Sequence, residues 1–295
     1  GSNNTAVGYH SLQANTTGNN NTAVGRNALD ANTTGTHNTA IGDQALTDST
    51  TGTENVAMGH ASLFENTTGG NNTAVGTEAL RNNLTADNNT AFGHSALKEN
   101  TTGTYNASLG ISSLKLNTTG EHNTALGADA LGQNTTASNN TAIGSSALYS
   151  NTTGNSNVAI GRGALDVNTT ANSNTAVGSS SLGTNTVGFS NTAVGADSLT
   201  KNTTGDYNVA VGQFALEENT TANRNTAVGT FCLERNTTGQ FNTGLGGWSL
   251  QVNTTADNNT AVGYFALNSN STGAKNNSIG VRALTANTTG GNNNA

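Results

Sequence analysis

The apolar and polar positions of this chain repeat every 17 residues from Asn4 to the end of the sequence. The first copy begins Asn-Thr-Ala-Val-Gly at 4–8, the second repeats these letters at 21–25, and the seventeenth begins at Asn276. We number the positions as slots from the first Asn, so that one copy, here called a coil, reads N-T-A-V-G-x-x-A-L-x-x-N-T-T-G-x-x. A short fixed period is typical of a solenoid, so the whole chain is interpreted as one array of coils.

A few slots accept almost no variation. Slot 1 is always Asn, slot 5 always Gly and slot 9 always Leu, and slot 12 is Asn in every coil except the one with Ser49. In the first coil these four slots are Asn4, Gly8, Leu12 and Asn15, which we predict to form structural ladders through the stack. Slot 4 is always apolar, and slot 8 is always Ala, Ser or Cys.

The charged residues occupy six other slots. All ten Lys and Arg, all seventeen Asp and Glu and all five His lie in slots 6, 7, 10, 11, 16 and 17. Because unpaired charges are almost never buried, these slots are predicted to face water.

This distribution predicts an all-β fold. Helix is disfavoured because Asn, Thr and Gly are weak helix formers, and 17 residues are too few for the usual helical repeats. We expect two extended segments per coil, in slots 1–4 and about 8–14, separated by a turn at the slot 5 Gly. The prediction is a parallel β-solenoid, or β-roll, of about 17 coils, forming a single continuous repeat domain over residues 1–295.

Several slots carry a more detailed expectation. The slot 5 Gly is predicted to have a positive φ or to lack room for a Cβ atom. Slot 15, which is Gly or Ala, is predicted to need only a small side chain, and slot 3 Ala is expected opposite slot 9 Leu. The Asn residues of slots 1 and 12 are expected to point inward and to bond amide to amide between coils.

The strand itself suggests self-association. Neighbouring strand side chains point to opposite faces, yet slots 2, 3 and 4 are all small or apolar, so both faces need cover. A second copy of the chain would cover the outer face, which predicts a homo-oligomer in the form of a symmetric trimer or dimer. The alternative is a monomer with a flattened coil.

Composition limits the remaining function classes. The 295 residues include 9% charged, 4% aromatic and no Pro, and the net charge of −7 is spread along the chain, which does not favour nucleic-acid binding. No apolar run is long enough to cross a bilayer, so no membrane insertion is expected. A single Cys excludes an intramolecular disulfide.

The Asn-Thr-Ala-Val-Gly-x-x-Ala-Leu units resemble the repeats of bacteriophage tail fibres and bacterial surface fibre proteins, and a lengthened form of the repeats in trimeric autotransporter adhesin heads. The resemblance covers the whole chain. It implies a homotrimeric left-handed parallel β-roll that acts outside the cell as a stiff shaft or an adhesive head. The unit here is longer than the adhesin-head repeat, and no coiled-coil stalk or membrane anchor accompanies it.

One group of residues is a candidate binding site. Slot 7 holds Phe214, Phe231, Trp248 and Phe265 in four successive coils, and Tyr264 lies beside the last. These rings are predicted to form a contiguous stripe on a water-facing slot, suited to sugar rings or a cell-surface receptor. The alternative is that the rings stack only to stabilise the sheet or to cover a neighbouring subunit.

Two further patterns have competing interpretations. Slots 12 to 14 form Asn-x-Thr or Asn-x-Ser acceptor sequences for glycans, for example at Asn32 and Asn66, but an inward Asn ladder explains the same letters. Rows of Thr in slots 2 and 14 suggest an ice-binding solenoid. That interpretation expects two outward Thr alternating on one strand, whereas slots 13 and 14 are adjacent and are predicted to face opposite ways, and slot 2 is followed on its face by Val.

The sequence offers little for catalysis. Every Asp, Glu and His lies in a solvated slot, His60 and His94 are two coils apart, and Cys232 replaces a small residue and is expected to be buried. We expect no enzyme activity, no metal and no cofactor. The predicted function is a structural extracellular fibre segment that gives rigid extension and surface presentation, with attachment to glycans or cell surfaces; the alternative is an ice-binding or other ligand-binding solenoid.

Overall fold

The computed structural model describes all residues 1–295 and contains seventeen parallel strands of three residues and no helix. The chain forms two compact units. Unit 1 comprises Gly1–Ser146 and Ser150–Thr153, and unit 2 comprises Ala147–Tyr149 and Gly154–Ala295. The predicted all-β parallel solenoid with 17 residues per coil is confirmed.

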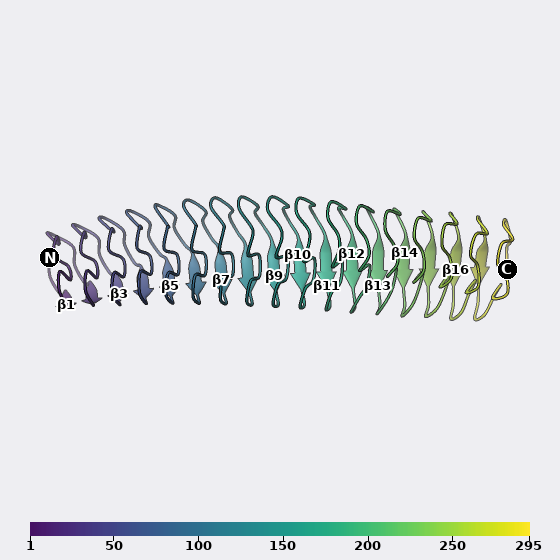
Figure 1. Cartoon of the computed structure of the whole chain (residues 1–295), viewed down its shortest axis with the longest axis horizontal. Helices are drawn as coiled ribbons and strands as arrows, with labels where there is room; N and C mark the ends of the chain where they lie inside the picture. Colours follow the sequence, from purple (N-terminus) through teal and green to yellow (C-terminus); the bar gives the residue numbers. More distant parts are fainter. The chain divides into compact units, whose positions relative to one another are not determined.

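Unit 1 contains nine strands, each paired in parallel with the next. Equivalent slots face each other, so that Thr22 pairs with Thr39 and Ala23 with Ala40. Figure 1 shows one strand in each coil. The strands are β1 (Thr5–Val7), β2 (Thr22–Val24), β3 (Thr39–Ile41), β4 (Val56–Met58), β5 (Thr73–Val75), β6 (Thr90–Phe92), β7 (Ala107–Leu109), β8 (Thr124–Leu126) and β9 (Thr141–Ile143).

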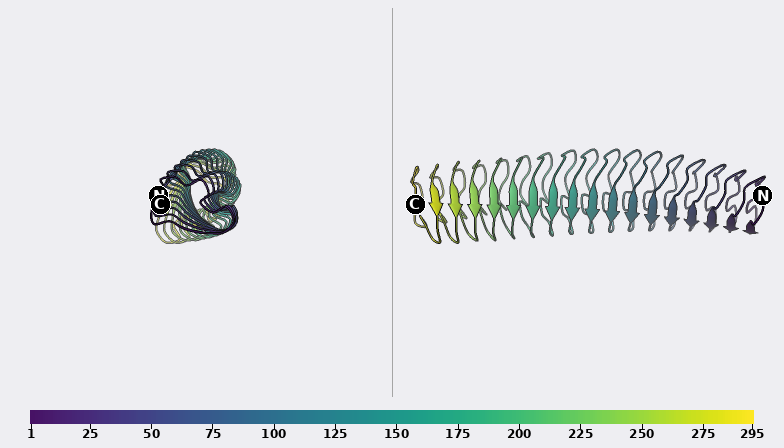
Figure 2. Two further views of the ribbon diagram at one scale, coloured as in Figure 1. Left: turned by 90° about the vertical axis from the view of Figure 1, so that its left-hand side faces the viewer. Right: turned by 180° about the vertical axis from the view of Figure 1, so that it is seen from behind.

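Unit 2 has the same construction. Thr175 pairs with Thr192 and Val177 with Val194, again slot on slot, and Figure 2 shows the strands of the unit side by side. The strands are β10 (Val158–Ile160), β11 (Thr175–Val177), β12 (Thr192–Val194), β13 (Val209–Val211), β14 (Thr226–Val228), β15 (Thr243–Leu245), β16 (Thr260–Val262) and β17 (Asn277–Ile279).

The prediction of a second extended segment in slots 8–14 is wrong. In the second coil the N–H of Ala28 donates to the oxygen of Gly25 at 3.4 Å, and the N–H of Asn32 donates to the oxygen of Leu29 at 3.3 Å. Each of these hydrogen bonds joins residues three apart in sequence and closes a four-residue β-turn. The two turns bend the coil twice after the strand. The ladder between coils nevertheless continues through the turns, because the N–H of Leu29 donates to Ala45 in the next coil at 3.1 Å.

Three slots per coil have a left-handed backbone. In slots 7, 9 and 17 the non-glycine residues have φ between 48° and 62°, including every slot 9 Leu from Leu12 onward. Left-handed φ costs a non-glycine residue about 1–3 kcal/mol and persists only where the surrounding structure compensates. Here the inter-coil hydrogen bonds and the buried Leu provide that compensation.

The slot 5 Gly meets both predicted requirements. Gly25 has a φ of 139°, and a Cβ atom there would lie 2.2 Å from the carbonyl oxygen of Gly42 in the next coil. The slot 15 glycines, such as Gly35, do not have a positive φ, and Ala replaces them in five coils, in agreement with the predicted need for a small side chain alone.

The core consists of narrow rows of small residues around Leu. The slot 9 Leu and slot 3 Ala of the second coil, Leu29 and Ala23, are fully buried. Gly244 shows what slot 3 faces, since a Cβ there would lie 2.5 Å from the Cys232 sulfur and 3.6 Å from Leu233 Cδ1. The expected position of slot 3 opposite slot 9 is confirmed, with slot 8 on the same side.

The Asn rows satisfy the polar groups of the interior. In slot 12 the predicted amide ladder is confirmed: Asn202 Nδ2 donates to Asn185 Oδ1 at 2.8 Å. In slot 1 the main bonding differs from the prediction, because Asn191 Oδ1 accepts the backbone N–H of Asn208 at 2.9 Å and Asn191 Nδ2 donates to the Gly205 carbonyl at 2.7 Å. The slot 1 side chain therefore joins backbone groups as well as amides, which fixes the chain just before each strand.

Candidate functional site

The outer side of the strands carries the side chains of slots 2 and 4, which we call the strand face. Slot 4 is apolar in every coil yet partly open to solvent, with Val24 36% exposed, Met58 40% and Leu126 44%. No charged residue occurs in slot 2 or slot 4 in any of the seventeen coils. The strand face is therefore an uncharged surface strip in which an apolar row in slot 4 runs beside a mainly Thr row in slot 2.

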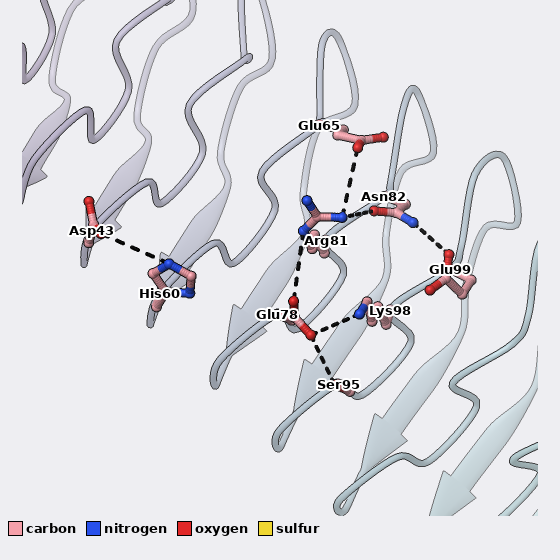
Figure 3. A network of polar contacts seen from close by, with 9 residues as sticks. All are labelled: Asp43, His60, Glu65, Glu78, Arg81, Asn82, Ser95, Lys98 and Glu99. Atoms are coloured by element: carbon pink, nitrogen blue, oxygen red, sulfur yellow. Dashed lines mark hydrogen bonds and ion pairs between the residues drawn. The ribbon is translucent and has the colours of Figure 1, made fainter.

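Charged side chains instead pair between neighbouring coils elsewhere on the surface. Figure 3 shows Lys98 in contact with Glu78 and Asn82 in contact with Glu99. Lys98 Nζ lies 2.9 Å from Glu78 Oε2, and Asn82 Nδ2 donates to Glu99 Oε2 at 2.6 Å. The hydrogen bond from Lys98 lowers the pKa of Glu78. Arg81 lies 4.0 Å from both Glu65 and Glu78 and completes this part of the network.

The slot 7 aromatic residues form one continuous stack in unit 2, as the sequence predicted. Phe214 stacks on Phe231 with a centroid distance of 5.1 Å, Phe231 on Trp248 at 5.4 Å, and Trp248 on Phe265 at 5.5 Å. Tyr264 packs edge-on against Trp248 at 5.6 Å and against Phe265 at 4.6 Å. The left-handed turn at slot 7 places each ring directly over its equivalent in the next coil.

The expectation that slot 7 faces water is only partly met. The four stacked rings are half-buried, and Tyr264 alone is exposed, at 46%. The inner rings cover each other's faces, so that mainly ring edges remain open to solvent, which favours the interpretation that the stack stabilises the sheet. Ligand binding by these residues stays a prediction.

A second aromatic row lies in slots 16 and 17 of unit 2, and the sequence interpretation missed it. The ring of Phe189 contacts Tyr207 edge-on at 5.0 Å. Arg224 Cζ lies over the rings of both Tyr207 and Phe241, 5.6 Å from each centroid. We call these four residues the Arg224 row. Its signal in the sequence is the spacing of 17 residues between Tyr207, Arg224 and Phe241.

The Arg224 row is more open than the slot 7 stack. Phe189 is 38% exposed, Tyr207 49% and Phe241 47%, and Arg224 is also exposed. Slot 17 follows a turn and directly precedes the buried slot 1 Asn, so its side chain points away from the core.

Burial decides between the two interpretations of the Asn-x-Thr sequences for most coils. Asn32 and Asn66 have no exposed surface, and the Nδ2 atom that would carry a glycan donates to a backbone carbonyl, for Asn66 that of Gly69 at 2.9 Å. Within the same triplet, slot 13 Thr such as Thr33 donates to the next coil, whereas slot 14 Thr such as Thr34 is exposed. Adjacent Thr residues thus point opposite ways, as the sequence predicted.

The other candidates for chemistry lie apart from one another. Cys232 is buried, as predicted, its sulfur lies 3.0 Å from Ser249 Oγ, and burial raises the pKa of its thiol to about 11. His60 lies 3.9 Å from Asp43, and no group of three or more His, Cys, Asp or Glu side chains could hold a metal ion. The surface has no pocket, and the chain has no helix that could span a membrane.

No protein-family model matches the chain, and no curated protein matches it.

Proposed function

We propose that this chain is a structural segment of an extracellular fibre, in which copies of the chain associate through the strand face. The observation that carries the proposal is the uncharged, partly exposed strip of slots 2 and 4, in which slot 4 is apolar in every coil. Slots 6, 7, 10, 11, 16 and 17 accept charged residues, whereas slots 2 and 4, like the partly exposed Gly of slot 5 and the Thr-rich slots 13 and 14, never do. The strand face differs from those slots because slot 4 carries an apolar side chain in all seventeen coils, so its exposure without charge needs a reason. A covering copy of the chain supplies one, because charge buried without a partner is strongly unfavourable.

The interior supports a mechanical role. The slot 12 amide ladder and the inter-coil backbone bonds join each coil to the next through several parallel rows of hydrogen bonds. A stack held in this way resists bending and local opening better than a single strand pair would. The resemblance of the repeats to those of tail fibres and adhesin heads agrees with this role and with a trimeric assembly.

Sedimentation velocity tests the proposal with two matched double variants. Leu109→Lys with Leu126→Lys introduces two charges on the strand face, and Ile111→Lys with Ala128→Lys introduces the same charges in slot 6 of the same coils. We expect the wild-type chain to sediment as a trimer, the slot 4 variant to associate at least about tenfold more weakly, and the slot 6 variant to behave as wild type.

Wild-type chains that remain single at high concentration would refute self-association. Equal behaviour of the two variants would refute the strand face as the interface. The ice-binding alternative is checked on the same sample by thermal hysteresis, which a fibre segment is not expected to produce.

A further inference from the structure

We propose that the Arg224 row is a binding site for an acidic polysaccharide whose sugars carry carboxylates. This inference deepens the attachment role expected of a fibre segment and rests on it. It assigns binding to a different set of residues from the slot 7 stack.

The first support is the unpaired charge of Arg224. The ion pairs of the chain use Arg26, His60, Arg81, Lys98 and Lys201, whereas Arg224 forms none. Its guanidinium lies between the rings of Tyr207 and Phe241, which fix its position along the coil axis. A guanidinium has five N–H donors and prefers a planar carboxylate, so an exposed and positioned arginine without an acidic partner fits a carboxylate ligand.

The second support is the charge of the surrounding surface. The segments 207–214, 224–231, 241–248 and 258–265, which carry slots 17 to 7 of four successive coils, contain no Asp or Glu, although the chain has a net charge of −7. Arg224 is their only charged residue. The nearby Asp206 and Asp257 in slot 16 accept backbone N–H groups, from Phe189 at 2.9 Å and from Gln240 at 2.6 Å. The equivalent surface of coils two to five carries Arg26, Asp43, Glu54 and Glu78, whereas the segments 139–146, 156–163 and 173–180 also lack Asp and Glu and contain only Arg162, which contacts no ring.

The third support is the spacing of the row. Successive members lie 5.0–5.6 Å apart, measured between ring centroids or from Arg224 Cζ to a ring centroid, close to the length of one sugar residue in an extended polysaccharide. Exposed aromatic edges and the hydroxyl and amide groups of neighbouring slots suit the mixed apolar and polar surface of a sugar. A polysaccharide lying along the row would place successive sugars against Tyr207, Arg224 and Phe241 with one carboxylate on the guanidinium.

Affinity electrophoresis at 0.15 M salt tests the site with two polymers that differ only in charge. The probes are polygalacturonate and its fully methyl-esterified form, and the variants are Arg224→Gln, Tyr207→Ser and Arg162→Gln. Ser already occupies slot 17 in Ser173, so Tyr207→Ser is compatible with the turn. Arg162 is the matched control because it is an exposed arginine of unit 2 that contacts no ring and forms no ion pair.

We expect polygalacturonate to bind the wild-type chain, and Arg224→Gln to weaken binding about tenfold or more through loss of a charge-assisted hydrogen bond. Tyr207→Ser is expected to weaken binding severalfold, Arg162→Gln less than twofold, and the methyl ester to bind at least about tenfold more weakly. Far-UV circular dichroism confirms that each variant keeps its fold.

Three results would overturn the proposal. These are no binding to polygalacturonate, equal binding of the methyl ester, or an equal loss in Arg162→Gln, which would indicate only non-specific attraction. A change in sedimentation of Arg224→Gln without a change in polymer binding would assign the row to a contact between copies and also overturn it. Because self-association is measured separately by sedimentation, failure of the polysaccharide site and failure of the fibre proposal remain distinguishable.

Discussion

The left-handed backbone of slot 7 makes a sharp prediction at two adjacent serines. Ser179 lies in slot 6 and Ser180 in slot 7 of the same coil, and both are half-buried. Ser180 has a φ of 56°, whereas Ser179 does not have a positive φ. Replacing each by Thr adds the same methyl group in nearly the same environment. Only the Ser180→Thr substitution places a β-branched side chain on a left-handed residue, where such side chains are strongly disfavoured.

The expected loss of stability is worked from the backbone conformation, because slot 7 leaves room around a Cβ atom. At Gly163, the slot 7 residue of the preceding coil, a Cβ atom would have no neighbour within 4 Å. A non-glycine residue in this conformation costs about 1–3 kcal/mol, with serine expected near the low end and a β-branched residue near the high end. Ser180→Thr should therefore destabilise by about 1–2 kcal/mol, and Ser179→Thr by less than about 0.5 kcal/mol, the range of ordinary surface substitutions.

Urea denaturation followed by circular dichroism measures both changes. Hydrogen exchange of the β11 amides reports whether the loss is local, as expected for a stack in which each coil contacts only its neighbours. Equal stabilities of the two variants, or a more stable Ser180→Thr chain, would refute the argument that φ restricts this slot.

Three further predictions address the interior and the charged slots. Gly212→Ala should destabilise the fold by about 3 kcal/mol or more in urea denaturation, because it puts a side chain on a residue with a φ of 132° and its Cβ would lie 2.6 Å from the Gly229 carbonyl carbon. Gly205→Ala in slot 15 should destabilise it less, although its Cβ would lie 2.4 Å from the Ala222 oxygen, because Gly205 has no positive φ and five coils accommodate Ala in that slot. Asn202→Asp should lower the free energy of unfolding by about 3–5 kcal/mol at pH 7 in the same assay, because it buries a charge and removes the amide donor to Asn185. A loss below about 1 kcal/mol would contradict the role of the slot 12 ladder. Burial raises the pKa of Asp166, so its ionisation destabilises the fold as pH rises through that pKa. Asp166→Asn should therefore raise the melting temperature at pH 7 and leave it unchanged well below pH 4. A higher melting temperature that persists in acid would contradict this cause.

The pattern of absent residues could have revealed the left-handed slots. Val, Ile and Thr never occur in slots 7 and 17, although the adjacent slots 6 and 16 contain Thr77, Ile111 and Thr36. Polarity alone does not explain this exclusion, because Phe and Trp occur in slot 7. The sequence interpretation considered charge and size in these slots and not branching at Cβ, and so it missed the turns.

The candidate site was predictable only in part. The spacing of Phe231 and Trp248 by one coil was sufficient to predict their stacking, because equal slots lie over one another. Their half-burial was not predictable, because it depends on how the slot 7 turn folds back toward the slot 8 residues. In the Arg224 row, Phe189 of slot 16 contacts Tyr207 of slot 17. The stacking of equal slots over one another does not predict a contact between two different slots.

The sequence by itself determined the period, the parallel pairing in register, the buried Leu and Ala rows and the role of the slot 5 Gly. The physical reason is that a repeated coil places identical residues over one another, so each slot must tolerate its own copy above and below. Only the tertiary structure decided that a single three-residue strand is present per coil, that slot 9 Leu has a left-handed φ, and that slot 1 Asn bonds to the backbone. These features depend on the path of the chain around one coil. Several paths would bury the same slots, so the repeat pattern alone does not select one of them.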